Sequence, residues 1–195
     1  MKVTEIVGFK RANLGRMEAQ ELRAQGMVPG ILYGGEEQVS FYAPAYLFRP
    51  LIFTSDAYEV KLNIEGKEYT AILQDKQYHP VNDQLIHVDL LEITPEKVIT
   101  INIPIKLTGT AIGAKQGGKL VQTLITLKVK GPSKDIPNFV NLDVTTLGLG
   151  KAIKVKSIEL PGLTILDSPA NPVASVTIPR ALRGAMQAAG AEAKK

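Results

Sequence analysis

The sequence predicts a mainly β protein built from two domains. Short stretches that alternate apolar and polar residues recur along the chain, and turns with glycine and proline separate them, as in all-β sandwiches and barrels. A length of 195 residues accommodates two domains of ordinary size. The clearest helix is expected at residues 16–25, where good helix formers occur without a β-branched residue. We therefore expect strands to dominate, with short helices between some of them.

The first half of the chain carries most of the expected elements. The expected strands are residues 3–10, 28–32, 38–42, 60–64, 67–73 and 85–91, and the expected helices are residues 16–25 and 44–52, the second interrupted near Pro50. Glu65-Gly66 separates two of these strands as a hairpin turn. Residues 74–80 are expected to form a polar segment that leads into a turn at residues 80–83.

A helix end and a short buried strand meet at residues 22–35. Arg23 lies in the last helical turn, Gly26 is placed to take a left-handed C-cap, and Gly34-Gly35 closes the strand. This arrangement brings the Arg23 guanidinium close to the Tyr33 phenol. The alternative is a purely structural corner with a half-buried Tyr33 and a solvated Arg23.

A second all-β domain, a sandwich or barrel, is expected after a linker at residues 94–97. Residues 98–107 alternate as a long one-sided strand, and further short strands are expected at 139–144, 152–156, 163–166 and 173–178. Residues 113–119 match the phosphate-loop pattern G-x-x-x-x-G-K, but Leu120 replaces the magnesium-binding hydroxyl. Since residues 120–131 also have strand composition, we interpret residues 109–120 as a flexible hairpin loop. The predicted domains are residues 1–93 and 94–179, followed by an Ala/Lys tail, 180–195, that is frayed or disordered in isolation.

Composition and charge exclude several classes of function. The chain has no cysteine, which excludes disulfides, thiolate nucleophiles and Cys-ligated zinc. It starts without a signal peptide and lacks an apolar run of the roughly 20 residues that a membrane helix needs, so we expect a cytoplasmic protein with no membrane partner. The net charge of +4 combines 9 Lys+Arg against 13 Asp+Glu in residues 1–93 with 14 against 6 in residues 94–195. Five bases and three acids in residues 1–35 still allow a local basic patch.

Two polar groups are candidates for binding. Arg16, Gln20 and Arg23 share one face of the predicted helix, which suits phosphates and base edges, although a solvated stripe has the same spacing. His87 and Asp89 lie on the polar face of the strand at 85–91, with a simple exposed pair as the alternative. No HExxH spacing and no G-x-S-x-G elbow accompanies them. We therefore expect no metal, no cofactor and no catalytic site.

Three runs of residues resemble one known family. R-x-x-G-x-V-P-G-x-L-Y-G at residues 23–34, K-R at 10–11 and Q-D-x-Q-x-H-P-x-x-x-x-x-x-H-V-D at 74–89 are similar to the 5S-rRNA-binding family of bacterial large-subunit ribosomal protein twenty-five. The long form of that family is called Ctc or general stress protein, and residues 109–120 resemble the start of its second domain. The resemblance covers almost the whole chain. It implies an N-terminal six-stranded β-barrel with short helices that docks on the loop E region of 5S rRNA.

The resemblance also implies RNA-facing positions for nine residues. They are Arg11, Arg16, Gln20, Arg23, Tyr33, Gln74, Tyr78, His87 and Asp89. Arginines would bind phosphates and base edges, while Tyr33 and His87 would donate to riboses or phosphates. Asp89 would accept from an amino group or a 2′-hydroxyl, or orient His87. Members of the family often have basic residues where this chain has Gln20-Glu21 and Tyr78, which lowers the electrostatic contribution here.

The resulting hypothesis is a structural component of the large ribosomal subunit on the cytoplasmic ribosome. Its expected partners are 5S rRNA and neighbouring ribosomal proteins, and off the ribosome we expect a monomer. One alternative is a stress-related RNA-binding protein that acts off the ribosome through the basic second domain. A small cytoplasmic hydrolase using His87 and Asp89 is the alternative from another class.

Overall fold

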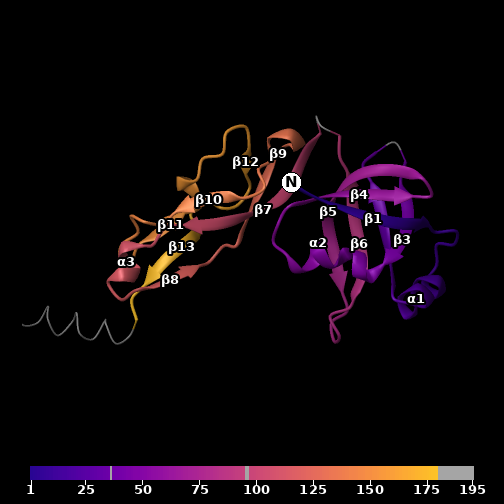
Figure 1. Cartoon of the computed structure of the whole chain (residues 1–195), viewed down its shortest axis with the longest axis horizontal. Coiled ribbons are helices and arrows are strands. Elements are labelled where there is room, and N and C mark those ends of the chain that lie inside the picture. The colour runs from indigo at the N-terminus through magenta and orange to yellow at the C-terminus, as the bar shows by residue number, and fades with distance from the viewer. Residues whose placement is uncertain (36, 95–96, 180–195) are drawn as a thin grey trace, which may run out of the picture. The chain divides into compact units, whose positions relative to one another are not determined.

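The computed structural model describes residues 1–35, 37–94 and 97–179, and the chain divides into two compact units (Figure 1). The first unit comprises Met1–Ile101 and Lys130–Asn138, and the second comprises Asn102–Val129 and the chain from Phe139 onward. The predicted domain boundary at residues 93/94 stays a prediction. The predicted tail at residues 180–195 lies outside the described residues.

Six strands of the first unit close into a barrel, and the expected mainly β fold class is confirmed. The strands are β1 (Lys2–Lys10), β2 (Met27–Tyr33), β3 (Val39–Pro44), β4 (Tyr58–Ile64), β5 (Lys67–Tyr78) and β6 (Leu85–Glu92), in the order β1-β3-β2-β6-β5-β4. The pairs β1–β4 and β2–β6 are parallel, and the other four are antiparallel. Three short helices accompany them: α1 (Arg16–Ala24), the 3-10 helix η1 (Ala45–Phe48) and α2 (Arg49–Phe53). Within the described residues, no helix combines the length and the apolar character needed to cross a membrane.

The alternation of side chains along the strands builds the barrel core. Phe41, Leu62 and Leu90 point inward and have no exposed surface. Glycine at position 30 lets the Phe41 ring cross the interior, because a Cβ there would lie 2.7 Å from Cζ of Phe41 and 2.9 Å from the Val88 carbonyl oxygen. The packing of the barrel interior therefore depends on the Phe41 ring lying against a glycine at position 30.

The hairpin turn between β4 and β5 is confirmed at Glu65-Gly66. Both residues adopt positive φ angles, 50° and 87°, which matches the twist of the flanking strands. The Gly66 amide also donates to Oδ1 of Asn63 at 3.0 Å. Local chemistry thus fixes this register, which aligns β5 with the rest of the barrel.

One expectation for the first unit was wrong. Residues 74–78 extend β5 instead of leaving it, because β6 supplies backbone partners and polar side chains are tolerated on the outer face of a barrel. The expected interruption of the second helix near Pro50 is confirmed. The 3-10 helix η1 ends at Phe48 and α2 begins at Arg49, so Pro50 lies in the first turn of α2, where its missing N–H costs no helical hydrogen bond.

The remaining strands form two further sheets. They are β7 (Val98–Thr108), β8 (Lys119–Gln122), β9 (Thr126–Pro132), β10 (Val140–Asp143), β11 (Ala152–Lys154), β12 (Thr164–Ile165) and β13 (Pro172–Thr177). One sheet has the order β10-β7-β9-β12 and the other the order β11-β13-β8. The helical turns are α3 (Ile112–Lys115), η2 (Ser133–Asp135) and η3 (Val155–Ser157). The expected second β domain is confirmed.

The glycine-rich segment at residues 109–120 differs from the expected flexible hairpin loop. It contains the single helical turn α3, and a Cβ on the buried Gly113 would lie 2.7 Å from the Gly148 carbonyl carbon. The expected strand at 120–131 is two strands, β8 and β9, separated by residues 123–125. Lys119 opens β8 rather than a helix, so this segment lacks the strand–loop–helix arrangement that cradles phosphates.

Candidate nucleic-acid interface

Three neighbouring strands present polar side chains on the outer face of the barrel. Asp89 on β6 is paired with Ile31 on β2 and with Asp75 on β5, so these three residues lie in one row across the sheet. The next row pairs His87 with Gln77. Since paired residues project to the same side, the outer face of β6 carries His87 and Asp89 while Val88 and Leu90 enter the core. The predicted orientation of this strand is confirmed.

His87 and Asp89 contact each other directly. Nδ1 of His87 lies 2.6 Å from Oδ1 of Asp89, and the two side chains are 29% and 30% exposed. The contact fixes the orientation of the imidazole and leaves Nε2 as the ring nitrogen for a ligand. Asp89 keeps its second carboxylate oxygen as an acceptor. Both side chains are thus held in place and still accessible.

The Tyr33 phenol joins this group from the end of β2. Partial burial raises its pKa above the ordinary value, and the negative charges of Asp89 and Asp75 raise the pKa further. The phenol therefore stays protonated at neutral pH and can donate a hydrogen bond. The site combines one phenol donor, one imidazole and two carboxylates.

A β-bulge in β5 gives Gln74 its position. The register of β5 against β6 shifts between Leu73 and Asp75, which leaves Gln74 as the additional residue. Bulges often re-aim a side chain next to a binding site. Gln74 is exposed, and its amide offers both a donor and an acceptor beside the row that contains Asp75 and Asp89.

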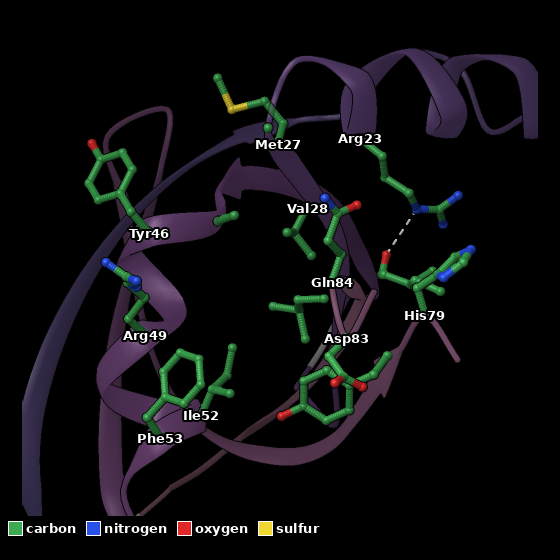
Figure 2. A pocket seen from close by; sticks show the side chains of 15 residues that line it. Arg23, Met27, Val28, Tyr46, Arg49, Ile52, Phe53, His79, Asp83 and Gln84 are labelled. Carbon is green, nitrogen blue, oxygen red and sulfur yellow. Dashed lines mark hydrogen bonds between the residues drawn. The ribbon is translucent and has the colours of Figure 1, made fainter. Parts of the chain in front are cut away.

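Helix α1 supplies the cationic side chains. Arg16, Gln20 and Arg23 are all exposed on one helix face, as expected from their spacing. Nε of Arg23 donates to the Ile86 carbonyl oxygen at 3.2 Å, which ties the end of α1 to the start of β6 (Figure 2). The terminal amino groups of Arg23 make no hydrogen bond to the described parts of the chain. The guanidinium is therefore positioned by the fold and available to an acceptor.

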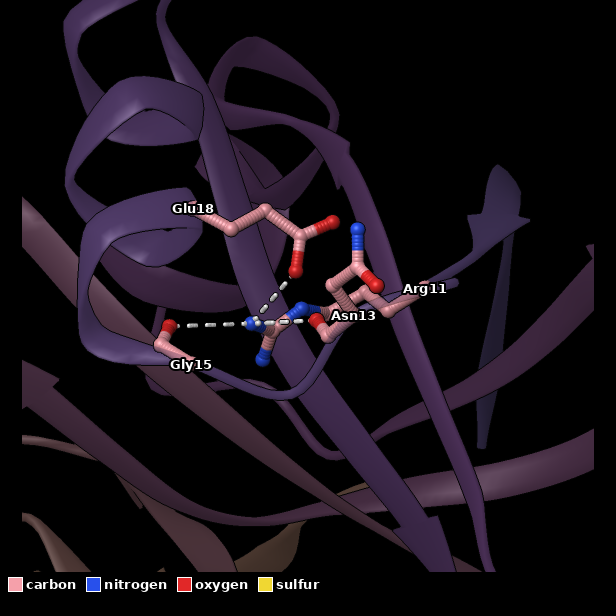
Figure 3. Close-up of polar contacts among 4 residues, drawn as sticks. All are labelled: Arg11, Asn13, Gly15 and Glu18. Atoms are coloured by element: carbon pink, nitrogen blue, oxygen red, sulfur yellow. Dashed lines mark hydrogen bonds and ion pairs between the residues drawn. The ribbon is translucent and has the colours of Figure 1, made fainter.

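Arg11 does not occupy the surface position that was predicted. Its side chain is 11% exposed, and Nη2 donates to the carbonyl oxygens of Asn13 and Gly15 at 3.2 and 3.5 Å (Figure 3). The same nitrogen lies 3.3 Å from Oε2 of Glu18 in the first turn of α1. Nε of Arg11 is buried without a partner among the described residues. This guanidinium holds the turn before α1 and is largely enclosed by the protein, and its predicted contact with RNA stays a prediction.

Tyr78 is also apart from the outer-face group. It lies at the end of β5, where its ring is 5.8 Å from the Lys76 ammonium and borders a cavity at the end of the barrel. Asp75 and Gln77, which the sequence interpretation missed, occupy the outer face instead. Asp75 and Gln77 alternate with Lys76, which would place them on one face of a strand. This signal can be used only if β5 is known to continue past residue 73.

The arrangement suits recognition of a polyanion by fixed donors and acceptors. Exposed arginines on α1 can contact phosphates, and the phenol, imidazole, amide and carboxylates can read ribose hydroxyls and base edges. Within residues 1–35, 37–94 and 97–179, no three His, Cys, Asp or Glu side chains are arranged so that they could hold a metal ion. The exposed arginines, amide, phenol, imidazole and carboxylates favour binding through hydrogen bonds and charge.

Comparisons with known proteins agree over both halves of the chain. The model of the ribosomal L25p family matches residues 6–90, and the model of the C-terminal domain of ribosomal protein TL5 matches residues 98–180. The large ribosomal subunit protein bL25 of Cytophaga hutchinsonii is 46% identical over 195 residues, which cover 100% of each chain. The bL25 protein of Amoebophilus asiaticus is 46% identical over 196 residues, again covering 100% of each chain. That of Porphyromonas gingivalis is 40% identical over 187 residues, or 95% of this chain and 97% of the relative.

Proposed function

This chain belongs to the ribosomal L25p family and is a protein of the large ribosomal subunit, and from that premise we propose that its barrel binds 5S rRNA. The family is a ribosomal structural protein rather than an enzyme, and its place is the cytoplasmic ribosome. The RNA surface consists of the outer faces of β2, β5 and β6 together with the exposed face of α1. Its residues are Arg16, Gln20, Arg23, Tyr33, Gln74, His87 and Asp89, with Asp75 and Gln77 added from the strand register.

The observation that carries this proposal is the contact between His87 and Asp89 beside Tyr33. A nonspecific phosphate-binding surface needs only lysines and arginines, whereas this surface holds two carboxylates at fixed positions. A carboxylate is repelled by phosphate but accepts hydrogen bonds from base amino groups and 2′-hydroxyls. These donors are presented in the wide minor groove of RNA, which supports recognition of a distorted RNA helix such as loop E.

Arginines and carboxylates then have separate roles. Arg16 and Arg23 on α1 attract the backbone and set the register of the protein on the helix. Asp89, with His87 fixed against it, selects RNA that offers donors at the matching place. Arg11 acts indirectly, because its hydrogen bonds to the turn at residues 13–15 and its contact with Glu18 hold the start of α1.

The test is a titration of the full chain against 5S rRNA and against an unrelated RNA hairpin of equal length at several salt concentrations. We expect preference for 5S rRNA at each salt concentration and protection of loop E nucleotides from chemical probes. Equal affinity for both RNAs would contradict the proposal. Co-sedimentation with large subunits distinguishes a ribosomal role from an RNA-binding role away from the ribosome.

A further inference from the structure

A cavity of about 450 Å³ lies at the end of the barrel where β2 and β6 begin (Figure 2). Its floor is apolar and includes Val28, Ile52 and Leu85. The side chains of η1 and α2 line one side, and the end of α1 and the turn between β5 and β6 line the other. A volume in this range, about 300–1,000 Å³, is typical of sites that take a small organic group.

Exposed aromatic side chains border this cavity. Tyr46 is 67% exposed and Phe53 is 77% exposed, and Tyr78, at 39%, lies on the strand opposite them. Large aromatic side chains are usually more buried than this in a protein without a partner. Their flat faces are suited to stacking on another ring system.

Charged and polar groups surround the aromatic side chains. Arg23 and Arg49 lie on opposite sides of the opening, and Asp83 is the one carboxylate among the described residues that line it (Figure 2). Gln84 and His79 add an amide and an imidazole. Nδ1 of His79 accepts from the Val81 amide at 3.3 Å, so Nε2 is the nitrogen left for a ligand.

We propose that this cavity binds an unpaired nucleobase of RNA next to the helix held on the barrel. The proposal rests on the proposed function, because Arg23 belongs to both sites: its Nε is fixed on Ile86 while its guanidinium borders the cavity. A strand leaving the bound helix passes Arg23 first. Its base stacks on Tyr46 or Phe53, and its flanking phosphates lie between Arg23 and Arg49.

The polar groups favour a nucleobase over an apolar side chain of a neighbouring protein. A base has donors and acceptors at its edge that can pair with Gln84, Asp83 and His79. An apolar side chain would cover these groups without pairing them, which costs free energy. The two arginines also favour an occupant that carries phosphates.

The experiment compares three RNAs binding to the full chain. One is the loop E helix alone, the second carries one unpaired 2-aminopurine nucleotide at a strand end, and the third carries an abasic nucleotide there. Both strand ends are tried. We expect the unpaired base to increase affinity at least about fivefold over the abasic RNA and its fluorescence to be quenched, as base–aromatic stacking requires.

The double variant Tyr46→Ala/Phe53→Ala should lose this gain and bind the helix alone as wild type does. Ile125→Ala is the matched control, since Ile125 is 60% exposed and does not line the cavity. An equal gain in the double variant, or no gain in wild type, overturns the proposal. A further outcome is that the double variant co-sediments less with large subunits while it keeps the affinity gain from the unpaired base. In that case a protein occupies the cavity, and the proposal is again overturned.

A single-stranded trinucleotide with central 2-aminopurine separates this proposal from the proposed function. Wild type should quench its fluorescence and the double variant should not, whatever the affinity for the helix. If the protein does not bind the loop E helix but quenches the trinucleotide, the result refutes 5S rRNA binding and leaves the base site standing. If the protein binds the loop E helix but quenches no 2-aminopurine, the result refutes the base site and leaves 5S rRNA binding standing.

Discussion

The two halves of the chain have opposite net charge. Residues 1–93 hold 9 Lys+Arg against 13 Asp+Glu, and residues 94–195 hold 14 against 6. All three ion pairs among the described residues nevertheless belong to the acidic half. In the basic half, Lys128 is exposed on its strand, and the Lys106 ammonium lies 4.0 Å from the ring centroid of Phe139.

The difference shows that net charge is a poor guide to a specific RNA site. Exposed lysines attract any polyanion and lose this attraction as salt rises. A site that distinguishes one RNA from another needs donors and acceptors held in fixed positions, as in the contact between His87 and Asp89. The acidic half has such groups, and we therefore expect selectivity to depend on it.

The largest expected effect comes from damaging the core of each unit in turn. Phe41 and Leu127 are both fully buried, the first in the barrel and the second in the other unit. Phe41→Ala should lower the free energy of unfolding of the barrel by about 3–5 kcal/mol, and Leu127→Ala should lower that of the second unit by about 2–5 kcal/mol. Hydrogen exchange resolved by residue measures both. Loss of 5S rRNA binding in Leu127→Ala but not in Phe41→Ala would reverse the comparison.

Asp89→Asn should weaken binding to 5S rRNA by about 1–3 kcal/mol, the scale for losing a charged hydrogen-bond partner. The amide keeps the size and one acceptor oxygen but loses the charge that holds His87. An unrelated hairpin offers no matching donors, so its affinity should stay constant or rise slightly. Parallel titrations measure this selectivity. Tighter binding of 5S rRNA would show that Asp89 merely lies in the repulsive field of the phosphates.

Arg23→Ala and Arg11→Met separate a contacting arginine from a positioning one. Each variant removes one positive charge, but Arg23 is exposed whereas the Arg11 side chain is 11% exposed and bonded to its own turn. Arg23→Ala should reduce the slope of log affinity against log salt by up to about one unit. Arg11→Met should weaken binding to a smaller extent and leave the slope unchanged. Equal slopes in the two variants would contradict the roles assigned to them.

The sequence alone predicted most elements whose signals are local. The helix at residues 16–25 was expected from its composition, and α1 spans Arg16–Ala24. The turn at Glu65-Gly66 and the outward position of His87 and Asp89 followed from turn chemistry and from alternation. In each case the determining residues lie within a few positions of each other.

Features that depend on the folded path of the chain or on distant segments could not be predicted. Arg11 turns inward because the Asn13 and Gly15 carbonyl groups and Glu18 surround it, and only the folded turn defines their directions. The polar residues after Leu73 continue β5 because β6 pairs with them. The cavity brings together β2, α2 and the turn before β6, and no spacing in the sequence indicates such a meeting.

The smallest expected effects are pH dependences that distinguish the two units. Burial, with the charges of Asp89 and Asp75, raises the pKa of Tyr33, so the folded barrel favours the neutral phenol. The contribution of the neutral phenol to the stability of the barrel is complete below the ordinary pKa near 10.0, and it is lost as pH rises through the raised pKa. Hydrogen bonds from the Thr145 amide and hydroxyl lower the pKa of Asp143 in the second unit. That contribution is complete above the ordinary value of 3.8 and is lost as pH falls through the lowered value.

Tyr33→Phe should therefore flatten the alkaline limb of the barrel's stability and leave its acid limb unchanged. Asp143→Asn should flatten the acid limb of the second unit and leave the barrel unaffected. Hydrogen exchange resolved by residue across the pH range measures both, and each variant serves as the control for the other. A barrel that responds to Asp143→Asn would mean that the units are coupled in stability. Tyr33→Phe also removes the phenol donor. The affinity of this variant for 5S rRNA at neutral pH therefore tests whether the phenol whose pKa is raised by burial and by the two carboxylates also donates a hydrogen bond to the RNA.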